Sequence, residues 1–137
     1  MKNSLLDCKV LIVEDVYESR LLVRNLMGRL GVTLIEAGDG FEGVQMARRE
    51  LPDLILMDLS LPVMDGWEAT RQLKAHPATA HIPVVIVTAH SMWDEALRVR
   101  EVGCAGYLMK PLDPIRFSEE VAQFLLEGAP RSWVPGV

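Results

Sequence analysis

Three carboxylates, a hydroxyl and an ammonium each stand at the end of a short apolar run in this sequence. Glu14 and Asp15 follow the first run, and Asp58 follows the third. Thr88 ends the fourth run, and Lys110 follows the fifth. An acid after an apolar run is more often a turn former or a helix cap than a functional group, so each position alone is weak. Together, the five positions indicate one shared site.

The chemistry that these groups could perform together is the transfer of a phosphoryl group to a carboxylate. Clustered carboxylates repel one another, and a hard divalent cation relieves that repulsion. A few protein oxygens, with space left for waters and a phosphate, suit Mg²⁺ better than Ca²⁺. A carboxylate in such a site can attack phosphorus and become an aspartyl phosphate. The Lys110 ammonium and the Thr88 hydroxyl would then stabilise the charge on the transferred oxygens.

Apolar runs that alternate with helix-period segments predict the elements that must position these groups. The predicted strands lie at 10–13, 33–35, 54–57, 84–87 and 107–109. Three of the runs are continuously apolar, as strands buried on both faces of a parallel sheet are. Capping acids at Asp39, Asp65 and Asp113 mark helix starts between the runs. This alternation predicts an α/β fold with helices on both faces of a parallel sheet, where ligands bind beyond the carboxyl ends of strands.

Composition limits what else the chain could be. It has 137 residues and a formal net charge of −5, which suits one acidic domain and argues against a basic nucleic-acid-binding module. There is no apolar run of membrane-spanning length and no signal peptide, so we expect a cytoplasmic protein that binds no membrane. We expect one domain over 1–127 and an irregular tail over 128–137. Cys8 and Cys104 are expected to be buried, reduced thiols.

Four sequence blocks resemble the receiver domain of two-component response regulators. The resemblance covers about residues 8–127, and its blocks are VLIVED at 10–15, DLILMDLSLPVMDG at 53–66, IPVVIVTA at 82–89 and GCAGYLMKP at 103–111. All four occur in the family's order and spacing, which makes the likeness specific. It implies a flavodoxin-like, doubly wound (βα)5 fold of three layers, with a five-stranded parallel sheet in the order 2-1-3-4-5.

The resemblance implies a phosphoacceptor site that binds Mg²⁺, or Mn²⁺ in its place. Asp58 would accept the phosphoryl group from a phosphohistidine on a sensor histidine kinase or a histidine phosphotransfer protein. Asp15 and Asp58 would ligate the ion directly, and Glu14 would act nearby through water. The backbone carbonyl of Ser60 would be the third protein ligand. Lys110 would bridge Asp58 and the phosphoryl group.

The resemblance also implies a switch next to this site. The Thr88 hydroxyl would turn toward the phosphoryl oxygens, and Tyr107 would move inward behind it. Ala89 follows Thr88 at the site, and Ser60 and His90 occupy the two positions that tune the phosphoryl lifetime in the family. The peptide bond before Pro111 is expected to be cis, which is plausible only because that residue is proline.

Partner binding, and not enzymatic turnover, is the function that we expect. The readout face would combine the fourth helix, the fifth strand and the fifth helix, with Trp93, Arg98 and Arg100 as candidate contacts. Trp93 could equally pack locally. Trp67, at the start of the third helix, is expected to be exposed scaffold. We expect a monomer or weak dimer, with no nucleic-acid partner and no attached output module.

The sequence leaves three alternatives to this interpretation. The chain could be a receiver excised from a hybrid histidine kinase. A Mg²⁺-dependent phosphohydrolase with an aspartyl nucleophile usually needs a second acid two residues further on, where Ser60 stands instead. A flavin-binding electron carrier of similar fold needs a phosphate-cradling loop after the first strand, but Glu14 and Asp15 would repel a phosphate. The phosphohydrolase and the flavin-binding carrier are therefore both disfavoured.

Overall fold

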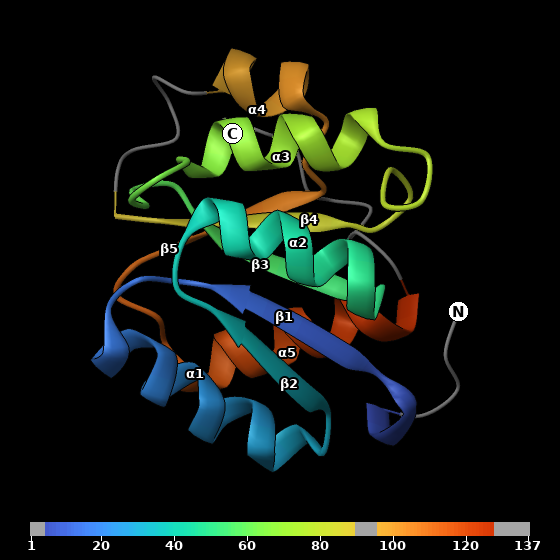
Figure 1. Ribbon diagram of the computed structural model, residues 1–137. Helices are drawn as coiled ribbons and strands as arrows, with labels where there is room; N and C mark the ends of the chain where they lie inside the picture. Colours follow the sequence, from blue (N-terminus) through green and yellow to red (C-terminus); the bar gives the residue numbers. More distant parts are fainter. Residues whose placement is uncertain (1–4, 90–95, 128–137) are drawn as a thin grey trace.

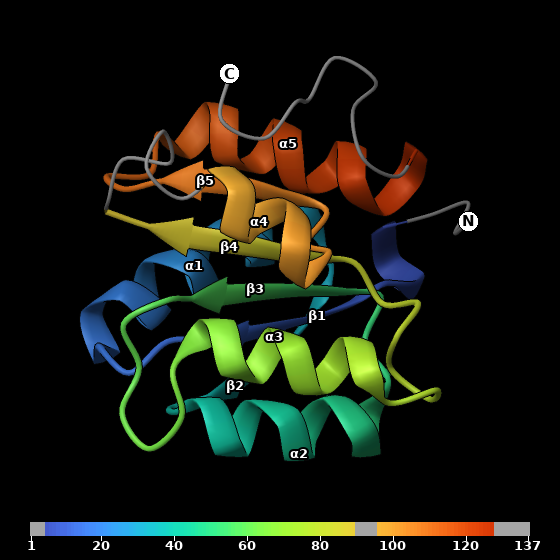
Figure 2. The same cartoon turned by 90° about the horizontal axis from the view of Figure 1, so that it is seen from above.

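The computed structural model describes residues 5–89 and 96–127 of the chain. A five-stranded sheet is covered by helices on both faces (Figure 1 and Figure 2). The strands are β1 (Lys9–Val13), β2 (Thr33–Ala37), β3 (Leu54–Asp58), β4 (Val84–Thr88) and β5 (Gly106–Met109). The helices are α1 (Tyr17–Leu30), α2 (Gly40–Glu50), α3 (Gly66–Ala75), α4 (Ala96–Val102) and α5 (Pro114–Glu127), with a 3-10 turn, η1 (Leu5–Asp7), before β1.

The sheet has the strand order β2-β1-β3-β4-β5, and all of its neighbouring strands run parallel. This confirms the predicted doubly wound, flavodoxin-like arrangement. In the register of the sheet, Val13 at the end of β1 lies opposite Ala37 of β2 and Met57 of β3. The order of strands reverses at β1, so the carboxyl ends of β1 and β3 border the crevice where doubly wound folds bind their ligands.

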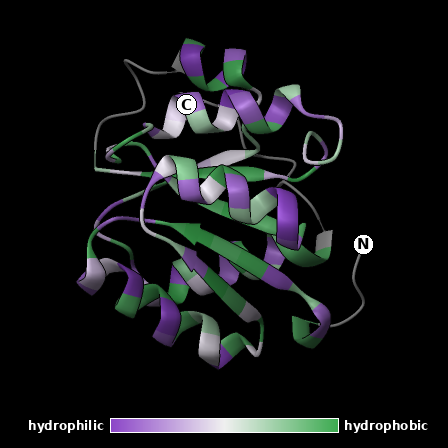
Figure 3. Ribbon diagram, in the orientation of Figure 1, coloured by the Kyte–Doolittle hydropathy of each residue, from purple (hydrophilic) through white to green (hydrophobic). Residues whose placement is uncertain are grey.

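Continuously apolar strands fill two hydrophobic cores, one on each face of the sheet. Successive side chains of a strand point to opposite faces. On β1, Leu11 and Val13 pack in the core shared with α2, α3 and α4, whereas Val10 and Ile12 pack against α1 and α5. Figure 3 shows this pattern as a largely apolar sheet between helices in which hydrophilic and hydrophobic residues are interspersed. Burial on both faces explains why the runs do not alternate with polar residues.

The predicted capping acids begin three of the helices. Asp39 and Asp65 each accept a hydrogen bond from the backbone N–H three residues later, at 2.7 and 2.9 Å. Asp113 accepts from the N–H groups of Ile115 and Arg116 at 3.0 and 3.1 Å. These bonds satisfy N–H groups that have no partner within the helix.

Gly66 allows α3 to begin directly against the end of β3. A Cβ atom at Gly66 would fall on the carbonyl oxygen of Asp58, so no larger residue fits there without movement of the backbone. The Gly66 N–H also donates to the carbonyl of Leu59 at 3.0 Å. The loop after β3 is therefore held close to the strand end that carries Asp58.

The expectation that Trp67 is exposed scaffold is wrong. Trp67 is 6% exposed and belongs to the core beneath α3 and α4. The guanidinium of Arg98, on α4, lies 4.7 Å from the centroid of its ring. The side chain is buried because α3 packs beside α4 on the same face of the sheet. Helical spacing within α3 does not show which neighbouring helix covers it.

Some expectations fall on parts of the chain that the structure does not describe. His90, Trp93 and the tail at 128–137 lie outside the described residues. Within residues 5–89 and 96–127, Cys8 is buried and Cys104 is half-buried. No helix in those ranges combines the length and apolarity that crossing a bilayer requires.

Candidate functional site

The carboxyl ends of four strands bring the predicted site residues to one edge of the sheet. Glu14 and Asp15 follow β1, and Asp58 is the last residue of β3. Thr88 ends β4, and Lys110 follows β5. Carboxylate oxygens of the three acids lie within 4.8 Å of one another. Residues that are up to 96 positions apart in the chain therefore share one site.

Lys110 connects two of the three carboxylates. Its Nζ donates to Glu14 Oε1 at 2.7 Å and to Asp58 Oδ2 at 3.4 Å. Burial acts to lower the pKa of Lys110, but the hydrogen bond to Glu14 and the charge of Asp58 outweigh burial, so the pKa is raised above its ordinary value. Lys110 therefore stays charged near neutral pH and offsets part of the repulsion between the acids.

Glu14 is held by protein donors at both carboxylate oxygens. Its Oε1 accepts from Lys110, and its Oε2 accepts from the backbone N–H of Val16 at 3.1 Å. Its own N–H donates to the carbonyl of Ala37 on β2 at 3.0 Å. Glu14 is 3% exposed, whereas Asp15 is exposed to solvent. The two adjacent acids thus differ in environment, since Glu14 is buried and hydrogen-bonded inside the site, whereas Asp15 is exposed to solvent.

Asp58 lies at the floor of the site. It is buried, with 8% of its surface exposed. Its Oδ1 accepts from the backbone N–H of Ser60 at 3.4 Å, and its Oδ2 faces Lys110. Ser60 itself is exposed, on the loop that joins β3 to α3. The carboxylate is therefore oriented by groups on both of its sides.

Thr88 and Tyr107 lie on the adjacent strands β4 and β5. Thr88 is 1% exposed, and its carbonyl accepts from the N–H of Lys110 at 2.8 Å, which ties the ends of the two strands together. Tyr107 is half-buried and packs against the core on the side of α4. Ala89 is exposed directly after Thr88. The peptide bond between Lys110 and Pro111 is cis.

A cavity of about 470 Å³ adjoins the acid group between α1 and α5. Its apolar wall includes Leu22 of α1 and Phe117 of α5. Asp58 and Lys110 also line it, together with Glu14. An apolar surface thus reaches the charged groups from the side of the two helices that share one face of the sheet.

The donor set fits a hard divalent cation. The three acids supply oxygen ligands only, which is what Mg²⁺ and Mn²⁺ prefer over nitrogen or sulfur. The two oxygens of Glu14 accept hydrogen bonds of 2.7 and 3.1 Å, whereas those of Asp58 accept only longer contacts of 3.4 Å. Asp15 is exposed, so Asp15 and Asp58 are the acids better placed to ligate an ion directly.

Sequence reasoning did not single out Arg20, which reaches the edge of this site. Its Nη1 donates to the backbone carbonyl of Glu14 at 3.2 Å. Arg20 lies on α1, where a single arginine is ordinarily a solvated residue of the polar face. The sequence contains no signal that would have distinguished it from the other arginines of that helix.

Comparison with known proteins matches residues 10–122 to the family described as "Response regulator receiver domain". Two relatives, the polar-differentiation response regulators DivK of Brucella anthropi and Brucella ovis, are each 40% identical over 116 residues, which cover 85% of this chain and 94% of theirs. Among solved structures, the chemotaxis protein CheY4 of Vibrio cholerae superposes with a TM-score of 0.80 at 26% identity, covering 85% of this chain and 97% of that one.

A second solved structure bears on the metal. The receiver domain of a Pseudomonas aeruginosa sensor histidine kinase, with a magnesium ion coordinated in its active site cleft, has a TM-score of 0.78 at 28% identity. The comparison covers 87% of this chain and 97% of that domain. The ion is a feature of that protein.

A doubly wound domain whose strand ends collect acids, a lysine and a buried threonine defines a class of signalling domain built to receive a phosphoryl group. This chain belongs to the response regulator receiver domain family, which is the family that its sequence resembles. It is a receiver of two-component signalling, and its family is one of signalling proteins.

Proposed function

We propose that Asp58 is the phosphoacceptor of this receiver, supplied by a phosphohistidine on a sensor histidine kinase or a histidine phosphotransfer protein. The observation that carries the proposal is the position of Asp58 at the end of β3, within the carboxylate cluster and 3.4 Å from the Lys110 ammonium. A carboxylate held at the carboxyl edge of a parallel sheet can meet a phosphoryl group presented from outside.

In the transfer, a carboxylate oxygen of Asp58 attacks phosphorus. The new O–P bond forms as the P–N bond to the donor imidazole breaks, and the imidazole leaves with the bonding electron pair and takes up a proton. Positioning and charge stabilisation supply most of the catalysis in such reactions. Lys110 contributes by moving its ammonium from Glu14 toward the phosphoryl oxygens. This movement is short, because the ammonium already contacts both Glu14 and Asp58.

Mg²⁺, or Mn²⁺ in its place, is the proposed cofactor. Asp15, Asp58 and the backbone carbonyl of Ser60 would hold it, with Glu14 acting through water. When bound, the ion neutralises charge on the transferring phosphoryl oxygens. The short hydrogen bonds at both Glu14 oxygens, 2.7 and 3.1 Å against 3.4 Å at Asp58, support an indirect role for Glu14.

The proposed switch uses Thr88 and Tyr107. The Thr88 hydroxyl would turn to the new phosphoryl oxygens, and Tyr107 would move inward behind it, altering the face formed by α4, β5 and α5. That face would bind the downstream protein partner. Ala89 would flank the phosphoryl group, while Ser60 and His90, the latter outside the described residues, would set its lifetime.

We further propose that the chain promotes only its own phosphorylation and dephosphorylation, as a monomer or weak dimer. Residues 1–127 would form the receiver, and 128–137 an irregular tail. The family match over residues 10–122 and the gathering of the acids at one sheet edge support the first of these assignments.

Phosphoryl uptake from acetyl phosphate tests the assignment of Asp58. With Mg²⁺ present, intact-mass measurement should show one added phosphoryl group on the unsubstituted chain and none on Asp58→Asn, because an amide is a poor nucleophile. Asp65→Asn is the matched control, since asparagine caps a helix as well as aspartate does. Full labelling of Asp58→Asn, or loss of labelling in Asp65→Asn alone, would contradict the proposal.

A further inference from the structure

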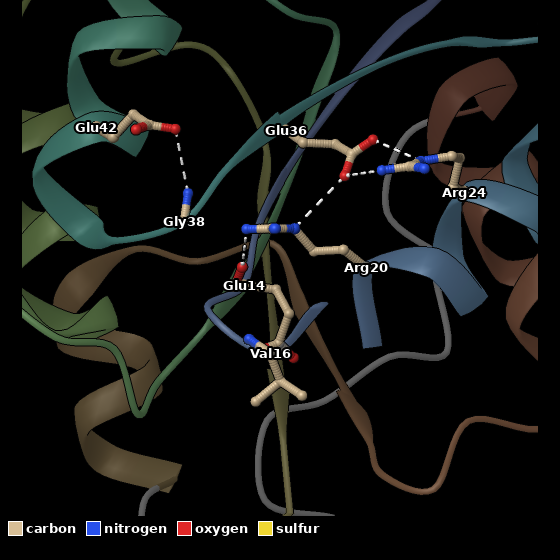
Figure 4. Close-up of polar contacts among 7 residues, drawn as sticks. All are labelled: Glu14, Val16, Arg20, Arg24, Glu36, Gly38 and Glu42. Atoms are coloured by element: carbon tan, nitrogen blue, oxygen red, sulfur yellow. Dashed lines mark hydrogen bonds and ion pairs between the residues drawn. The ribbon is translucent and has the colours of Figure 1, made fainter. Parts of the chain in front are cut away.

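Arg20, on the first turns of α1, spans two elements that border the acid cluster. Its Nη1 donates to the backbone carbonyl of Glu14 at 3.2 Å, and its Nε lies 3.5 Å from Glu36 Oε1 on β2. Figure 4 shows the guanidinium between the Glu14 backbone carbonyl and the Glu36 carboxylate, with a dashed line to each. The side chain thus connects the loop after β1 to the edge strand of the sheet.

We propose that Arg20 is a positioning residue of the phosphoacceptor site, which sets the direction of Asp15 by holding the peptide group between Glu14 and Asp15. This inference rests on the proposed function of the site. It assigns Arg20 no contact with the phosphoryl group or the cation.

Peptide planarity explains how a bond to a carbonyl can orient the next residue. The carbonyl oxygen of Glu14 lies in one plane with the amide nitrogen and the Cα of Asp15. A donor that fixes the position of this oxygen therefore also fixes the position of the Asp15 Cα, from which the side chain extends. The other groups of Glu14 are already held by Lys110, Val16 and Ala37. The hydrogen bond from Arg20 holds the remaining backbone group of Glu14, its carbonyl. Asp15 is exposed, and its side chain makes none of the hydrogen bonds described.

The surroundings of the Arg20 guanidinium restrict its position. Its Nε is the buried side-chain atom of the described residues that has no hydrogen-bond partner, although it pairs in charge with Glu36. A Cβ atom at Gly38 would lie 3.2 Å from Nη1, so the backbone there leaves just enough room for the arginine. A buried N–H without a hydrogen-bond partner lowers the stability of the fold. Its presence here is consistent with a role that needs the several N–H donors of a guanidinium, which a lysine does not have.

Arg24, one turn further along α1, provides an internal comparison. It binds the same Glu36 more closely, at 2.8 and 3.0 Å, and lies 6.0 Å from the Tyr17 ring, which Arg20 approaches at 5.9 Å. Among the hydrogen bonds described, Arg24 makes none to Glu14 (Figure 4). The two arginines therefore share a helix, a carboxylate and an aromatic neighbour, and differ in their contact with the site.

The test compares Arg20→Met with Arg24→Met in Mg²⁺ affinity, measured by titration calorimetry with magnesium chloride alone. Loss of a residue that supports metal ligands typically weakens metal binding by about 10-fold or more. We expect about a 10-fold weaker affinity for Arg20→Met and less than about a 2-fold change for Arg24→Met. The Mg²⁺ concentration for half-maximal labelling by acetyl phosphate should shift by the same factor.

Two further variants keep the test informative if Arg20→Met folds poorly. Arg20→Lys retains the charge without the fork, and should bind Mg²⁺ nearly as weakly as Arg20→Met. Gly38→Ala leaves Arg20 in place but crowds its Nη1, and should weaken Mg²⁺ binding by a smaller factor. Urea unfolding without Mg²⁺ shows which effects are due to stability alone.

Each outcome bears on one proposal or on both. If the unsubstituted chain neither binds Mg²⁺ nor takes up a phosphoryl group, the proposed function and the role of Arg20 both fail. If it does both, and Arg20→Met matches Arg24→Met in Mg²⁺ affinity, only the role of Arg20 is overturned. Full recovery of affinity in Arg20→Lys would also overturn it, because charge alone would then suffice.

Discussion

At the residue scale, the pairing of Lys110 with Glu14 is the contact that most affects how the site works. Glu14 is almost fully buried, and a buried carboxylate needs a charged or hydrogen-bonding partner. Lys110 supplies it at 2.7 Å while remaining 3.4 Å from Asp58. The lysine is thus shared between an acid that stabilises the resting state and the proposed acceptor.

Cys104 should be a slow nucleophile and a source of alkaline instability. Burial raises the pKa of its thiol to about 11 from an ordinary value of 9.0, and its Sγ donates to the carbonyl of Val99 at 3.3 Å. A rise of about two units in the pKa means that, at mildly alkaline pH, the thiolate fraction of Cys104 is about 100-fold lower than that of an ordinary cysteine. Alkylation of Cys104 by iodoacetamide, followed by peptide mass mapping, should therefore be about 100-fold slower in the folded chain than in urea.

The sign of the pH effect on stability follows from the same shift. Because the folded-state pKa of Cys104 is raised, its contribution is complete below about 9 and is lost as pH rises toward about 11, where the unfolded thiol ionises first. Cys104→Ala should remove that part of the alkaline loss in urea unfolding. An unchanged alkaline slope in Cys104→Ala would contradict the assignment.

At the element scale, the contact between Trp67 and Arg98 joins α3 to α4. Cation–π contacts at exposed sites contribute about 0.5–1 kcal/mol. Arg98→Ala should lower the free energy of unfolding by about that amount, because the ring loses its cationic neighbour. Urea unfolding measures the difference.

Arg100→Ala is the matched control for this prediction. Arg100 is exposed on the same helix, and it makes no described ring contact. Equal losses in the two variants would show that any arginine of α4 has the same effect and that the ring contact contributes nothing of its own. The comparison matters because α4 belongs to the proposed readout face.

At the scale of the whole molecule, three acids within 4.8 Å of one another should cost folding stability that a divalent cation restores. A ligand that binds only the folded state stabilises it by about 2.7 kcal/mol at about 100 times its Kd. Mg²⁺ should therefore raise the melting temperature well beyond the effect of sodium chloride at equal ionic strength.

Asp15→Asn should reverse both effects of the acid cluster. Without Mg²⁺ it should be more stable than the unsubstituted chain, since one of three like charges is gone, and Mg²⁺ should stabilise it little. Glu119→Gln, which neutralises an exposed acid of α5, controls for net charge. Equal stabilisation of all three proteins by Mg²⁺ would rule out the cluster as the binding site.

Much of the fold and the site follows from local sequence patterns together with one rule of topology. Continuously apolar runs predict buried parallel strands, and capping acids such as Asp39 and Asp65 predict helix starts, because both depend on neighbours within a few residues. Right-handed crossovers leave few ways to wind such a sheet, and parallel strands place their carboxyl ends at one edge. The convergence of Asp58 and Lys110 could therefore be predicted from the chain alone.

Tertiary structure alone decided which side chains pair with which. Helical spacing did not show that Trp67 is covered by α4, nor that Arg20 reaches Glu14 while Arg24 does not. Nor could sequence show that Lys110 and Val16 occupy both oxygens of Glu14. The sequence determined the elements and the edge where they meet, since those depend on local spacing and handedness. Pairing across elements depends on distances of a few ångströms between distant residues, which only the packed fold defines.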